Sequence, residues 1–301
     1  MSAPEYSEGA VVMNAVFSIH FDGPIVIEHK VSLRVMAKTY EHMQRSIDRA
    51  YLDTKYGNVW KHARLKQEDY EYSEFLAEYP REGGIILDGV KARAGAIIDR
   101  INSAISMPFA RAIQQGVEEH ASIVDQLPQR RQFAHARREQ LATYQDMVDH
   151  PDERIVRAYS DRSIVKEIDQ IASMVKPDEL NGSYVELKLY GSQAHPVYRF
   201  DAARAKRFHE IVSRRELGEP VLIRGKIRSL DHGNRFTSMK AKILNLDSNR
   251  EVTLHMGSEE DFIKLHPYHT AEQVSLFASP VIEFGTYDPN GGDMYFVDIA
   301  E

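Results

Sequence analysis

Short β-strand patterns separated by turns fill the last quarter of the chain, and they constrain the fold more than any other feature. The turns fall at 231–234, 247–249 and 289–292. The runs between them are VLIRGKIRSL, FTSMKAKIL, EVTLHM, SPVIEFGTY and MYFVDIA. Five strands with a short helical insert near Glu259–Leu265 predict a small closed β-barrel of the OB kind or a similar one.

The N-terminal part combines strand patterns with turn signals. Val11–Phe21 is apolar and rich in β-branched and aromatic residues, and it stops at the turn Asp22-Gly23-Pro24. Ile25–Ile27 resumes as a second predicted strand, and further short strands are expected between Val59 and Leu87.

Two helices are predicted in the same part of the chain. Ser32 can cap the first helix and Gly57 can end it. The second begins near Val90, and Pro108 is expected to end or kink it. Helices packed on one face of a small sheet make the chain an α+β protein.

The middle of the chain changes character. Residues 114–176 are highly charged, contain almost no glycine and read as helices broken at Pro128 and Pro151. A seam runs through them at helical spacing, and its members are Ile164, Ile168, Ile171 and Val175. This seam can lie over the sheet or pair with a second copy of the chain, so a homo-oligomer stays open.

A hairpin of 184–190 and 197–200 and a helix from Ala202 to about Arg215 precede the barrel. The predicted organisation is an α+β domain at 1–113, a helical segment at 114–180, the hairpin with its helix at 181–220, and the barrel at 221–301.

The first hairpin of the barrel is unusually basic. It contains six basic residues against the single acid Asp231, with Phe236 at its turn. The basic residues are Arg224, Lys226, Arg228, Arg235, Lys240 and Lys242. Strand alternation puts them on the outer face of the barrel, over an inner face of Leu222, Ile227 and Ile243. Such a stripe predicts contact with a phosphate backbone, and the alternative is an ordinary solvated face.

A second pattern has the outline of the PD-(D/E)xK nuclease motif. Asp178 is followed by Glu186 and Lys188, and residues two apart on a strand share a face. In this alternative the two carboxylates hold Mg²⁺ and the lysine positions the attacking water. The short gap between the acids counts against it, and simple strand amphipathicity explains the same residues. Asp22 with Glu28 and Lys30 matches the pattern equally well.

Composition excludes several other classes. The chain has no cysteine, so thiolate metal sites, disulfides and cysteine nucleophiles are absent. No P-loop, Rossmann glycine pattern or G-x-S-x-G elbow occurs, and no cofactor is predicted. Residues 1–9 lack the features of a secretory signal, and the longest apolar stretch is too short to span a membrane, so a cytoplasmic location is expected.

The sequence therefore favours a binding or adaptor protein without catalysis of its own, contacting nucleic acid or a protein partner through the barrel hairpin. The net charge of −7 opposes a general affinity for nucleic acid. The metal-dependent nuclease and an oligomeric structural or assembly protein remain as alternatives.

Overall fold

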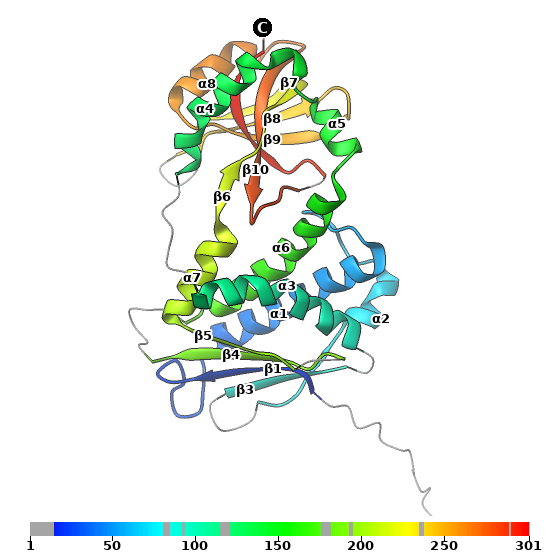
Figure 1. Cartoon of the computed structure of the whole chain (residues 1–301), viewed down its shortest axis with the longest axis vertical. Coiled ribbons are helices and arrows are strands. Elements are labelled where there is room, and N and C mark those ends of the chain that lie inside the picture. The colour runs from blue at the N-terminus through cyan, green and yellow to red at the C-terminus, as the bar shows by residue number, and fades with distance from the viewer. Residues whose placement is uncertain are drawn as a thin grey trace, which may run out of the picture.

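Two β-sheets stand at opposite ends of the molecule, with long helices between them (Figure 1). The computed structural model describes residues 15–80, 85–91, 94–114, 121–175, 182–192, 195–234, 238–288 and 290–300. Each sheet has its own hydrophobic core. The α+β class with a small sheet and a barrel is confirmed.

The first sheet is antiparallel throughout and is built from both halves of the chain. Its order is β2 (Leu76–Ala77), β3 (Ile85–Val90), β1 (Ala15–Asp22), β4 (Tyr184–Leu189) and β5 (Val197–Asp201). In the central strand Ile19 lies opposite Leu87 on one side and Leu187 on the other, and all three are buried. The predicted hairpin is confirmed, and it completes the N-terminal sheet.

Four helices cover one face of this sheet (Figure 1). They are α1 (Leu33–Tyr56), α3 (Gly95–Gln114), α6 (Glu153–Ala172) and α7 (Ala202–Ser213). The predicted ends of α1 are confirmed, because the Ser32 hydroxyl accepts from Val35 N–H at 3.2 Å and Gly57 has a φ of +67°.

The apolar seam of the middle segment is buried in this first core. Ile164, Ile168, Ile171 and Val175 are at most 2% exposed there. The seam thus packs against other parts of the same chain and does not support homo-oligomerisation, which stays a prediction.

The second sheet closes into a five-stranded barrel. Its strands are β7 (Val221–Asp231), β8 (Lys240–Asn245), β9 (Glu251–His255), β10 (Val274–Glu283) and β11 (Asp293–Ile299). The strands follow the order β7–β8–β9–β11–β10, and β10 pairs with β7 to close the barrel. The pairing of β9 with β11 is parallel. Helix α8 (Glu259–Leu265) connects β9 to β10. This is the OB arrangement. Gly225 permits the closure, since a Cβ there would collide with Ile243 of the neighbouring strand.

Shorter elements flank the barrel. They are β6 (Arg215–Leu217), which pairs with the end of β10, α4 (Ile123–Ala136) and α5 (Tyr144–Asp149). Leu222 was expected inside the barrel, but the side chains of β7 that point into the barrel are those of Val221, Ile223 and Ile227. Leu222 instead packs outside, in a cluster with Phe277.

Several local predictions are wrong. Ile25–Ile27 forms no strand and contributes one bridge, Ile27 to Lys30. Between Val59 and Leu87, over the described residues, the chain makes helical turns at Gln67–Ser73 where strands were expected, whereas β2 and the start of β3 are strands as expected.

The prolines end fewer helices than expected, and a kink at Pro108 stays a prediction. Helix α3 continues through Pro108 and α4 through Pro128, while Pro151 does precede α6. An interior proline costs a helix about 3 kcal/mol. Burial of Ile105 and Ala112 around Pro108 offsets this cost in α3.

The remaining predictions concern larger units. The structure joins residues 184–213 to the first core, but the boundaries of independently folding domains stay a prediction. Over the described ranges, no helix is both long and apolar enough to cross a membrane.

Candidate functional site

The outer face of the barrel presents a continuous row of side chains across three strands. Lys240 of β8 lies opposite His255 of β9, which lies opposite Tyr295 of β11. Their strand neighbours Ala241, Leu254 and others point into the barrel core, so alternation directs this row outward. A second row beside it contains Lys242, Thr253 and Asp293.

His255 and Tyr295 form an aromatic pair within the first row. Their ring centroids are 5.5 Å apart and the rings are inclined by 30°. Burial lowers the pKa of His255, and Lys61, Arg215 and Lys240 lower it further against the opposing effect of Asp293. The surroundings thus favour the neutral form of the imidazole, which stacks on the Tyr295 ring.

The basic stripe of β7 lies on the same outer surface. Arg224, Lys226 and Arg228 are exposed and alternate with the buried Gly225 and Ile227. A bulge between Ile227 and Ser229 turns Arg228 and its neighbour outward together. The predicted alternation therefore holds along this strand.

Some of these cations have acidic partners. Arg224 pairs with Asp247 at 3.3 Å, Lys242 with Glu251 at 2.7 Å, and Lys240 with Asp231 at 3.8 Å. Within the described residues, Lys226 and Arg228 have no carboxylate at ion-pair distance. Exposed pairs are weak and exchange partners readily, so the stripe is available to phosphates. The predicted Arg235 and Phe236 lie outside the described residues.

The residues of the nuclease alternative lie far from the barrel, on the first sheet. Glu186 and Lys188 share the face opposite to the one that the helices cover, and they form an ion pair of 3.1 Å. Asp178 lies outside the described residues, and no group of three or more potential metal ligands occurs in the part of the chain that is described. The structure thus places one carboxylate and the lysine of the proposed site side by side, and the nuclease alternative stays a prediction.

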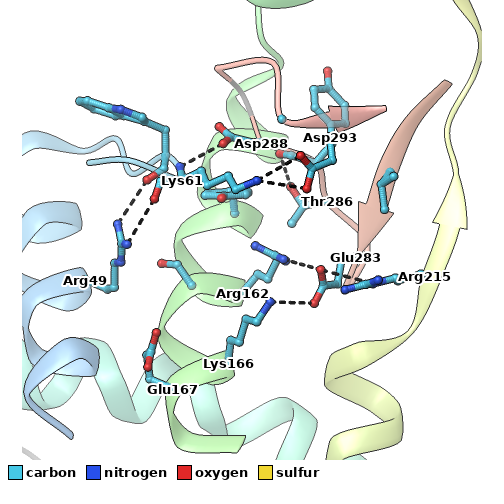
Figure 2. A pocket seen from close by; sticks show the side chains of 16 residues that line it. Arg49, Lys61, Arg162, Lys166, Glu167, Arg215, Glu283, Thr286, Asp288 and Asp293 are labelled. Atoms are coloured by element: carbon cyan, nitrogen blue, oxygen red, sulfur yellow. Dashed lines mark hydrogen bonds and ion pairs between the residues drawn. The ribbon is translucent and has the colours of Figure 1, made fainter. Parts of the chain in front are cut away.

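A cleft of about 250 Å³ lies at the junction of the two ends of the molecule (Figure 2). Its walls come from α1, the turn after α1, α6, β6 and the connection between β10 and β11. Five cations line it: Arg49, Lys61, Arg162, Lys166 and Arg215. Its carboxylates are Glu167, Glu283, Asp288 and Asp293.

Sequence patterns missed the aromatic pair and the cleft. His255 and Tyr295 meet only because β9 and β11 are parallel neighbours, and the cleft residues come from segments that only tertiary packing brings together. Comparisons of the chain with protein-family models, with curated proteins and with solved structures returned no match, so that function is inferred from geometry alone.

Proposed function

We propose that the protein binds single-stranded nucleic acid on the outer face of β7, β8, β9 and β11, without a catalytic step of its own. The observation that carries this proposal is the row of Lys240, His255 and Tyr295 on an OB barrel. Aromatic rings stack on unpaired bases of any sequence, and flanking cations track the phosphates. Bases of a duplex already stack on one another, which favours a single strand.

A strand bound on this face is affected more by the charges of the face than by the net charge of the whole chain. At physiological salt, exposed charges are screened beyond about 8 Å. A strand on the face therefore responds to Lys226, Arg228 and Lys240 more than to distant acids. Its binding should weaken steeply with salt, since each neutralised phosphate releases counterions.

Fluorescence anisotropy with a labelled 15-nucleotide single strand tests the proposal at two salt concentrations. The variant Arg224→Glu/Lys226→Glu/Arg228→Glu should bind about tenfold more weakly or worse, with an unchanged melting temperature. The matched control Arg34→Glu/Lys38→Glu/Lys206→Glu changes the net charge equally at exposed positions of α1 and α7. Equal losses in both variants, or the absence of salt-sensitive binding, would refute the proposed face.

The aromatic pair of His255 and Tyr295 allows a second, independent test of the proposal. Tyr295→Leu keeps most of the buried apolar surface and removes the ring, and should cost about 1–3 kcal/mol of binding if a base stacks there. Unchanged affinity in this variant would exclude the stacking role of Tyr295.

The same strands incubated with Mg²⁺ test the nuclease alternative. The observation behind it is the 3.1 Å pair of Glu186 and Lys188 on one strand face. Cleavage that disappears in Glu186→Ala would favour it, and cleavage that persists in a clean preparation of that variant would eliminate the site.

A further inference from the structure

Cations from both ends of the molecule converge on one carboxylate in the junction cleft. Figure 2 shows Arg162, Lys166 and Arg215 directed at Glu283, which ends β10. Arg162 forms an ion pair with one carboxylate oxygen, Lys166 Nζ lies 3.3 Å from the other, and Arg215 Nε lies 3.7 Å away. Arg162 and Lys166 are one helical turn apart on α6, so both face the barrel.

This cluster carries a surplus of positive charge. Burial alone would raise the pKa of Glu283, but Arg162, Lys166 and Arg215 overcome it and hold the pKa below its ordinary value. The ionised Glu283 neutralises one of three cations and leaves two charges uncompensated. The Arg162 side chain is only 15% exposed, and its Nε is buried without a hydrogen-bond partner. Arg162 pairs directly with Glu283, so the two surplus charges lie on the half-exposed Lys166 and Arg215, which an anion entering the cleft can reach.

The other acids of the cleft are already engaged. Asp293 accepts from Lys61 Nζ at 3.1 Å, and Asp288 accepts from the Lys61 backbone N–H at 3.0 Å. Glu167 pairs with His42 at 2.7 Å. The cleft as a whole has five cations for four carboxylates, and the excess of cations is concentrated around Glu283.

A further cation on the opposite wall adds to the surplus. Arg49 donates to the backbone carbonyls of Trp60 at 3.2 Å and Ala63 at 3.3 Å, and among the described residues no carboxylate lies at ion-pair distance from it. Carbonyl dipoles orient the guanidinium without neutralising it. Cations thus line the cleft on both walls.

We propose that this cleft binds a phosphate monoester. Arginine and lysine donate charge-assisted hydrogen bonds to phosphate oxygens, and three cations that share the single carboxylate of Glu283 leave donors for a multiply charged anion such as the dianion of a phosphate monoester. The volume of about 250 Å³ exceeds what a phosphate group alone fills, since a water molecule takes about 30 Å³. Trp60 and Tyr287 line the remaining space and offer surfaces for an attached sugar or base.

Two sources can supply this group: a free nucleotide, or the phosphorylated end of a strand. The cleft adjoins the proposed binding face, because Asp293 begins β11 and lies beside Thr253 in the second row. The phosphate site itself does not depend on strand binding, since the free nucleotide is a sufficient ligand.

Trp60, the only tryptophan, lines the cleft and provides a local fluorescence signal. Titrations with ribose 5-phosphate and, by calorimetry, with AMP should saturate at constant ionic strength, while ribose and adenosine should not bind. Lys166→Gln/Arg215→Gln should weaken phosphate binding at least tenfold. Both side chains are about half exposed, so this variant is expected to fold, and its melting temperature verifies that. Arg34→Gln/Lys206→Gln is the matched control and should bind as the unaltered protein does.

Absence of saturable binding by either phosphorylated compound would overturn the proposal, as would equal binding of ribose and adenosine or full affinity in Lys166→Gln/Arg215→Gln. A dT12 strand with a 5′-phosphate, compared with its 5′-hydroxyl form, then identifies the source. A tenfold preference for the phosphorylated strand, lost in that variant, supports the strand end, and AMP binding without the preference supports the free nucleotide. The Arg224→Glu/Lys226→Glu/Arg228→Glu variant separates the two proposals, since it should lose strand binding and retain AMP.

Discussion

Helix α6 takes part in two clusters of charged side chains that differ in their balance. In the first, Arg157 and Asp161 of α6 meet Asp53 of α1 and Arg100 of α3. Arg100 Nε lies 2.5 Å from Asp53 Oδ2, and Arg100 Nη2 lies 2.6 Å from Asp161 Oδ1. Arg157 Nη1 lies 2.8 Å from the same Asp53 oxygen. Two acids face two arginines, and the net charge is zero.

The second cluster, around Glu283, has three cations for one carboxylate. Each cluster has an exposed member, since the Arg157 and Arg215 side chains are both 56% exposed, but only the first contains an almost fully buried pair, Asp53 and Arg100. A balanced network has no charge left over and can only fix helices against one another. An unbalanced network at a cleft has charge left for a ligand, and this contrast underlies the predictions below.

The largest effect is expected from breaking the balanced cluster. Asp53→Asn leaves the buried Arg100 with one acidic partner fewer, and removing one member of a buried pair costs about 3–5 kcal/mol. Urea unfolding should show this loss, whereas AMP affinity per folded molecule should not change. A loss below about 1 kcal/mol would mean that the balance of this network does not matter for stability.

Glu283→Gln tests the unbalanced cluster in the same way. Its expected cost is smaller, about 1–3 kcal/mol at pH 7, because solvent reaches two of its three cations. AMP should bind severalfold more tightly, since an anion that competes for the cations has been removed. Weaker AMP binding in a folded variant would contradict the idea of surplus charge.

The pH dependence of this variant follows from the lowered pKa of Glu283. A carboxyl whose folded pKa is below the unfolded value of about 4.5 stabilises the fold above that pH, and the contribution disappears as pH falls through the folded pKa. The deficit of Glu283→Gln should therefore shrink when unfolding is measured below pH 4.

Asp48 of α1 is a third case, a half-buried carboxyl with an amide partner. Burial raises its pKa to about 6, against the lowering effects of Gln44 and Arg49. Its charged form costs stability above pH 6, and the cost vanishes below the unfolded pKa of about 3.8. Asp48→Asn should thus stabilise the protein by about 1–2 kcal/mol at pH 8, with allowance for partial exposure, and not at pH 3.5.

Unfolding at both pH values checks this prediction, with the exposed Glu272→Gln as the control for a lost negative charge. An equal gain at both pH values would show that ionisation of Asp48 is not the cause.

The comparison also shows what the sequence can predict. Helix α1, helix α8 and the barrel strands were predicted because their signals are local: a cap at Ser32, a stop at Gly57, and alternation between turns. The stripe of Arg224, Lys226 and Arg228 follows from the same alternation. Ile25–Ile27 failed because three apolar residues do not specify a strand, and here Ile25 is buried while Ile27 is 71% exposed.

Sites made by tertiary packing leave no such local signal. The aromatic pair requires knowing that β9 and β11 are parallel neighbours, and Glu283 meets Arg162 only when the barrel docks on α6. The residues next to Arg49 and Arg215 in the sequence do not indicate that the two arginines line the same cleft. Charge balance, which separates the two clusters, is likewise a property of the folded molecule.

The smallest effect is expected at the rim of the cleft. Lys61 and Asp293 are 47% and 39% exposed, and an exposed pair contributes about 0–1 kcal/mol. Lys61→Gln retains the backbone N–H that bonds Asp288, so the loop after β10 keeps its anchor. The variant should lose less than about 1 kcal/mol in urea, and 1 M salt, with a Debye length of about 3 Å, should erase even that difference. A loss of 3 kcal/mol or more, as at Asp53, would show that the pair of Lys61 and Asp293 is a structural contact and not a weak exposed pair at the rim.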